Sequence, residues 1–191
     1  MNKEIKEAKN RLNNIEDRCD LLWINLKEYF TASGSKHETF ESDKYIEAFY
    51  SIDDNNRIFK RFHIHVDKEN DLFKSIVFIS EGYDDEKSRQ VLILAAHFNS
   101  LMRRGVVRVN TNLCTVSMEF GENILLPFMF SGRIHSMIGS HYEMSIDVVW
   151  AFNRLFLFDE DPVYIIVDLQ KKIDKRVKDN QINIQKKIIS G

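Results

Sequence analysis

Residues 61–67 read Arg-Phe-His-Ile-His-Val-Asp, so polar and apolar side chains alternate along the whole stretch. Successive side chains of an extended chain point to opposite faces, which places Phe62, Ile64 and Val66 together on one face. This alternation is typical of a strand in an antiparallel sheet that is covered on one side only. The alternation therefore predicts a sheet with one buried face and one polar face.

Further strand candidates lie on both sides of this stretch. Residues 45–52, 58–67 and 73–80 are rich in aromatic and β-branched side chains, and short polar turns separate them. Such short connections favour a three-strand antiparallel meander. Residues 106–110 and 114–120 predict a hairpin. We expect residues 125–130, which Pro127 interrupts, to form an edge strand or to cover the core.

Helices are expected between and after these strands. Asp84 or Asp85 can cap a helix that runs to about Arg104, with Gly105 as its stop. Its centre, residues 91–96, is apolar nearly all round. We therefore expect the sheet to pack against one side of this helix and a second helix or subunit to pack against another. Ser140 and Glu143 form a capping box for a helix to about Leu157, and Asp161-Pro162 opens a last helix through Val177.

The resulting fold class is α+β, an antiparallel sheet packed with helices in the order α-βββ-α-ββ-α, with extra N- and C-terminal helices. We divide the chain into an N-terminal amphipathic helix at residues 1–30, a core at 40–158, and a basic helix and tail at 159–191. The length of 191 residues suits one domain.

The N-terminal helix carries the clearest periodicity, an apolar stripe from Ile5 to Tyr29 with spacings of three and four. The same stripe satisfies a coiled-coil pattern, so it forms either a zipper with a second copy or a face that packs on the chain's own sheet. Ala8 and Cys19 are poor zipper residues and favour the second reading. The partner-interface candidates on the stripe are Leu12, Ile15, Leu22 and Leu26.

Composition sets broad limits on function. A net charge of −2 gives no general attraction to nucleic acid or anionic membranes. Cys19 and Cys114 lie far apart within apolar patterns, which suits buried free thiols in a reducing compartment. We expect a cytoplasmic location, because the first residues lack the pattern of a secretory signal and no apolar run is long enough to span a membrane.

One group of residues suggests metal binding. His63, His65 and Asp67 share a strand face, and with Glu69 they resemble the H-x-H-x3-E opening of the cupin metal motif. The glycines around that motif and its later histidine are missing here. We interpret the group as a solvated strand face, expect no cofactor, and keep a small metal-binding protein or metalloenzyme as an alternative function.

No group of residues makes a catalytic motif. Ser140 follows Gly139 without the strand that a nucleophile elbow requires. His97, His135 and His141 are interpreted as packed or surface histidines. We therefore assign no catalytic residue and expect binding rather than catalysis.

The C-terminal segment concentrates basic side chains, which are Lys171, Lys172, Lys175, Arg176, Lys178, Lys186 and Lys187. They could contact phosphates, so a nucleic-acid-associated accessory role is a further alternative. A solvated helix face is favoured, because no aromatic residues are interleaved to stack on bases.

The element order, the run from Phe98 to Met102 and the hairpin that begins at Gly105 resemble the type III secretion chaperone-like fold, including the bacterial YbjN family. The resemblance covers about residues 40–158 and implies a non-enzymatic, often dimeric module that binds protein segments or serves in regulation. The leading expectation is therefore a chaperone-like or regulatory protein-interaction module, a homodimer or a binder of another protein, with no membrane partner.

Overall fold

The computed structural model describes residues 15–33, 37–42, 45–50, 62–67, 69–70, 72–123 and 131–189. Its elements confirm the α+β class expected from the sequence. In chain order they are α2 (Ile15–Ser33), β1 (His37–Glu41), β2 (Tyr45–Tyr50), β3 (Phe62–Asp67), β4 (Leu72–Ser80), the short 3₁₀ helix η1 (Asp85–Lys87), α3 (Ser88–Leu101), β5 (Val106–Asn110), β6 (Thr115–Asn123), α5 (Ser131–Phe158) and α6 (Pro162–Ile189).

The strands form one six-stranded sheet in the order β1-β2-β3-β4-β6-β5, and every neighbouring pair is antiparallel. The predicted meander is present but has a fourth strand, β1, that the sequence did not predict. The predicted hairpin of β5 and β6 is confirmed and joins the meander through β6 beside β4. Its turn extends through Cys114, which was predicted to begin the strand.

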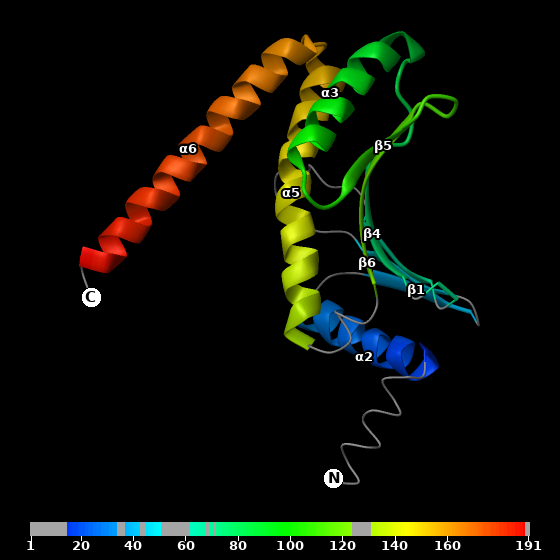
Figure 1. The fold of residues 1–191 in the computed structure, drawn as a ribbon. Coiled ribbons are helices and arrows are strands. Elements are labelled where there is room, and N and C mark those ends of the chain that lie inside the picture. The colour runs from blue at the N-terminus through cyan, green and yellow to red at the C-terminus, as the bar shows by residue number, and fades with distance from the viewer. Residues whose placement is uncertain are drawn as a thin grey trace.

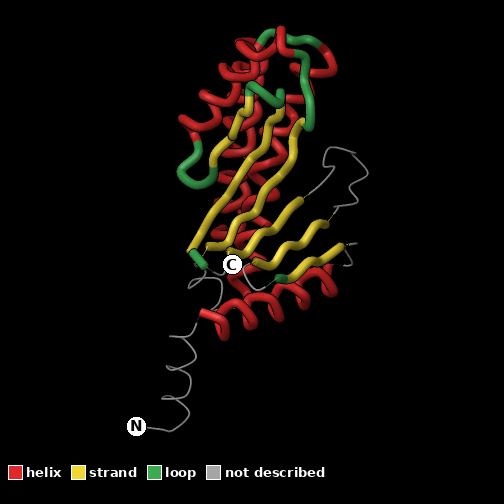
Figure 2. Tube along the Cα trace, turned by 90° about the vertical axis from the view of Figure 1, so that its right-hand side faces the viewer, coloured by secondary structure: helices red, strands yellow, loops and turns green. Residues whose placement is uncertain are grey.

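The two faces of the sheet differ. Helices α3 and α5 pack on one face, and α2 contacts α5 near the β1 end (Figure 1). The alternation predicted for β3 is confirmed, because Phe62, Ile64 and Val66 are buried on this face. Figure 2 shows the opposite face, over which no described helix lies. We call it the open face.

Helix α2 contributes to the core of its own chain. Leu22 and Leu26 have no exposed surface, and Trp23 and Phe30 are also buried. Two of the four proposed interface residues are therefore core residues, which agrees with the intramolecular reading of the stripe. Leu12 lies outside the described residues, and Ile15 begins α2 with a side chain that is not described.

Two predicted helix ends are wrong. Helix α5 begins at Ser131, so Ser140 lies inside the helix and cannot cap it. Buried Met137 and Ile138 explain the earlier start, because they extend the apolar face of α5 toward its N-terminus. Helix α3 ends at Leu101, and Gly105, with φ of +82°, instead shapes the entry into β5. Of the two caps considered, Asp84 caps η1, where its side chain accepts a hydrogen bond from the Glu86 backbone, whereas α3 follows Lys87 without a side-chain cap.

Helix α6 begins at Pro162 as predicted and runs to Ile189, beyond the predicted end near Val177. Ile165 and Leu169 anchor its first half in the core, whereas residues 174–183 are exposed and the helix projects from the body of the molecule (Figure 1). Within the described part of the chain, no helix is long and apolar enough to cross a membrane. The division at residues 30, 40 and 158 stays a prediction, as does the interpretation of residues 125–130, all of which lie outside the described ranges.

Candidate metal centre on the open face

Two neighbouring strands bring three metal-ligand side chains together on the open face. Glu47 of β2 lies opposite His65 of β3 in the antiparallel register, and His63 lies two residues before His65 on the same strand. Side chains two residues apart point to the same face, so the register itself gathers the three groups. The side chains of Glu47, His63 and His65 are 25 %, 13 % and 23 % exposed, so the cluster is partly exposed, although the Nε2 atom of His63 itself is buried.

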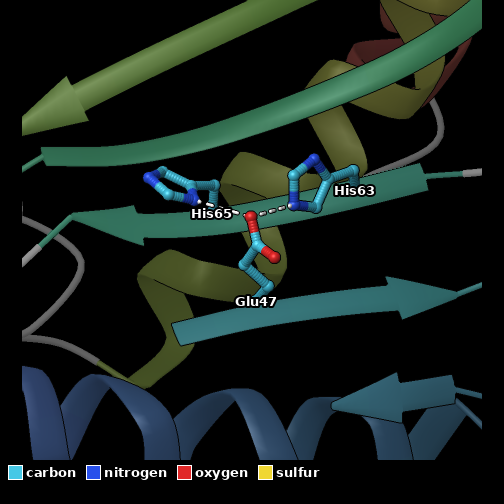
Figure 3. Close-up of side chains that lie close together, drawn as sticks. All are labelled: Glu47, His63 and His65. Atoms are coloured by element: carbon cyan, nitrogen blue, oxygen red, sulfur yellow. Dashed lines mark hydrogen bonds and ion pairs between the residues drawn. The ribbon is translucent and has the colours of Figure 1, made fainter. Parts of the chain in front are cut away.

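The donor atoms converge on one carboxylate oxygen. Glu47 Oε1 lies 3.2 Å from His63 Nε2 and 3.1 Å from His65 Nδ1. Figure 3 shows the Glu47 side chain rising from β2 between the two imidazoles of β3. One ligand atom from each residue lies within 4.8 Å of the others.

These separations resemble the edges of a metal coordination shell. Zinc bonds to imidazole nitrogen and carboxylate oxygen are about 2.0–2.2 Å long, which makes the edge of a tetrahedral site about 3.3 Å. The two oxygen–nitrogen distances in the cluster, 3.2 and 3.1 Å, are close to that value. Small movements of the two imidazoles would let both nitrogens and the carboxylate oxygen bind one metal ion. Three protein ligands would then leave the fourth coordination position open, as in catalytic zinc sites.

Neighbouring rings position the histidines. The His63 ring stacks on Phe78 of β4, with centroids 6.5 Å apart and planes 12° apart. The His63 and His65 rings meet edge to face at 6.0 Å. Because β3 is hydrogen-bonded on both sides, to β2 and β4, both imidazoles extend from a rigid part of the sheet.

Asp67, the third ligand considered from the sequence, does not join the cluster. Its carboxylate accepts hydrogen bonds from the backbone N of Glu69 and of Asn70, both at 3.0 Å, and from Asn70 Nδ2 at 2.7 Å. The bonds from Asn70, first from its side chain and then from its backbone, hold the pKa of Asp67 below its usual value. Asp67 and Glu69 therefore belong to the turn after β3, and Glu47 supplies the carboxylate that the sequence reading missed.

A second polar pair lies in the core. His141 Nδ1 of α5 is 2.6 Å from Ser75 Oγ of β4, and these residues are 0 % and 1 % exposed. The pair has the reach of a nucleophile and its base, but neither group meets solvent. Burial lowers the pKa of His141 to about 4, so the ring is neutral near pH 7. We interpret the pair as structural, which agrees with the first of the two sequence interpretations of His141, a packed or a surface residue.

Among the other sequence candidates, His97 is half-buried in α3. Cys114 lies partly exposed in the β5–β6 turn with φ of +50°, so the expectation of a buried thiol is wrong at this position. The side chains of Cys19 and His135 lie outside the described part of the structure.

The basic segment of α6 is partly neutralised by acidic side chains. Lys172 and Arg176 both pair with Asp147 of α5, the lysine at 3.1 Å, and Lys171 pairs with Asp168 at 3.0 Å. These pairs reduce the positive field available to phosphates. Lys175 and Lys178 are exposed, and the side chains of Lys186 and Lys187 are not described.

Comparison with known proteins found no match for this chain among protein-family models, curated proteins or solved structures. The resemblance to the type III secretion chaperone-like fold stays a prediction.

Proposed function

We propose that this chain binds a divalent transition-metal ion, with zinc as the reference metal, through Glu47, His63 and His65. The observation that carries the proposal is the meeting of two imidazole nitrogens at one carboxylate oxygen, at 3.2 and 3.1 Å, on a partly exposed sheet face. Imidazole and carboxylate ligands suit zinc, iron and nickel, and a three-ligand set keeps a position free for water or a bound molecule. The proposal is for binding and assigns no reaction.

Calorimetric titration of the untagged, metal-free chain with zinc tests this function. We expect one zinc ion per chain. Zinc at about 100 times its dissociation constant would stabilise the folded state by about 2.7 kcal/mol. For a domain of this size that raises the Tm by about 5–10 °C. A chain that takes up no zinc and keeps its Tm would contradict the proposal.

Two carboxylate variants locate the site. Glu47→Gln should weaken zinc binding strongly, because an amide oxygen is a poor substitute for a carboxylate ligand. Asp67→Asn is the matched control, since Asp67 closes the turn after β3, and it should keep the affinity of the parent chain. An equal loss of zinc affinity in both variants, or a loss of zinc affinity in Asp67→Asn alone, would contradict the assignment of the site to Glu47.

As a second candidate function we propose self-association through the corner between α5 and α6, which is one form of the interaction module expected from the sequence. Large apolar side chains with exposures of 46–71 % gather in sequence there, and they are Leu157, Phe158, Val163, Tyr164 and Val167. Exposed apolar groups of this size commonly mark interfaces.

Light scattering at several protein concentrations tests this second function. We expect a dimer that Val163→Glu together with Val167→Glu converts to a folded monomer, because both side chains are exposed in α6. A parent chain that is monomeric at every concentration would rule out the second copy as occupant. A chaperone-like or regulatory role toward another protein stays a prediction.

A further inference from the structure

A lysine adjoins the candidate metal centre in the sheet register. One row of paired residues crosses the open face from β1 to β6, and it reads Phe40, Glu47, His65, Lys74, Gly121. Lys74 of β4 is therefore the direct cross-strand neighbour of His65. Directly opposed side chains begin about 4.5–5.5 Å apart at their Cβ atoms, well within the length of a lysine.

The acidic side chains near Lys74 on this face have other partners. Glu119 of β6 pairs with Arg108 of β5. The Asp67 carboxylate is held by the turn after β3, and Glu47 faces the two histidines. Among the described residues, no ion pair or hydrogen bond of the Lys74 ammonium is found.

The sheet is unobstructed on the far side of Lys74. Gly121 continues the row and has no side chain, and a Cβ built there would meet no atom closer than 3.8 Å. A small molecule beside the ammonium would thus meet backbone and the apolar Cδ1 end of Leu72, which are the nearest neighbours of that position. Positive charge from Lys74 and from a metal ion at His65 would then act on the same space.

We propose that this space binds a small oxyanion, with one oxygen on the metal's open position and another accepting a hydrogen bond from the Lys74 ammonium. This inference rests on the proposed metal function and names the ligand class of the same site. Carboxylates and phosphates share the required chemistry, because both place two oxygens on one central atom. Charge-assisted hydrogen bonds of this kind are about twice as strong as neutral ones.

Cobalt(II) provides the test, because its visible spectrum reports each change in its ligands. The full chain is loaded with cobalt, and acetate and inorganic phosphate are titrated in separate arms. We expect a saturable spectral change with at least one anion, and the arm with the tighter binding distinguishes the two sources. Lys74→Gln should take up cobalt at least as well as the parent chain and bind the anion about tenfold more weakly or worse.

The controls separate the two proposals. Lys74→Arg keeps the positive charge and should retain most of the anion affinity. Failure of the parent chain to take up cobalt would refute the metal function itself. Cobalt uptake without a response to either anion, or equal anion affinity in the parent and Lys74→Gln, would leave the metal site intact and overturn the oxyanion inference.

Discussion

Acidification should destabilise this fold through His141, and the size of the effect follows from its burial. The ring has no exposed surface and packs against Phe62 and Phe120 at centroid distances of 5.9 and 5.7 Å. Its Nε2 atom has no hydrogen-bond partner among the described residues, and Nδ1 meets Ser75. A proton added to this ring would place a charge in an apolar shell.

The sign and magnitude are set by the two pKa values. The pKa of His141 is about 4 in the fold and 6.5 in the unfolded chain, so the unfolded chain binds the proton more readily. The stabilising effect of the neutral ring is complete above about pH 6.5 and is lost as the pH falls toward 4. A difference of about 2.5 pKa units, at about 1.36 kcal/mol per unit, amounts to about 3 kcal/mol. That is a large share of the roughly 5–15 kcal/mol that stabilises a typical domain.

Guanidinium chloride unfolding at pH 7 and pH 4.5, followed by tryptophan fluorescence, measures this effect. His141→Gln removes the titrating ring, so the free energy of unfolding should fall less on acidification, by about 2–3 kcal/mol, than in the parent chain. Ser75→Ala is the control and should keep the parent's pH dependence, because burial rather than the serine lowers the pKa of His141. Parallel pH profiles of the parent and His141→Gln would refute the reasoning.

Three further perturbations address the fold. Gly105→Ala should cost about 1–2 kcal/mol in denaturant unfolding, because the residue has φ of +82° and its new Cβ would lie 3.1 Å from the Glu119 carbonyl. Gly139→Ala is the opposite case, a glycine in α5 with nothing within 4 Å of the added Cβ, and should stabilise the chain by about 0.5–1 kcal/mol. Asp147→Asn should speed hydrogen exchange in α6, because it weakens the pairs with Lys172 and Arg176, and unchanged exchange would show that those pairs do not hold the helix.

The strand alternation carried most of the predictive information about the fold. Phe62, Ile64 and Val66 are buried as the period of two requires. Strand β1 was missed because its sequence, His-Glu-Thr-Phe-Glu, contains one apolar residue, and Phe40 is 53 % exposed at this edge of the sheet. An edge strand that contributes little to the core leaves little hydrophobic pattern to read.

Capping residues predicted the start of α5 less well than its apolar face did. Ser140 and Glu143 have the spacing of a capping box, yet the helix passes through them because residues before Ser140 continue its buried face. A cap contributes about 1 kcal/mol, less than the burial of one large apolar side chain. Tertiary packing therefore decides where α5 begins.

Two of the three candidate ligands could be predicted from one strand, and the third could not. The spacing of His63 and His65 places both on one face, which the structure confirms. The carboxylate is different, because Glu47 precedes His65 by 18 residues and meets it only through the β2–β3 register. The alternation within a strand gives its faces but not its pairing with a neighbour, so Asp67 was the nearest carboxylate visible in sequence.

The most direct measurement of the central claim follows the ring nitrogens of the six histidines by NMR while zinc is added to the full chain. If zinc binds at Glu47, His63 and His65, the NMR signals of His63 Nε2 and His65 Nδ1 should shift together. These shifts should saturate at one zinc ion per chain. The buried His141 ring should keep its signals. Zinc-dependent shifts confined to other histidines, or none at all at saturating zinc, would contradict the site.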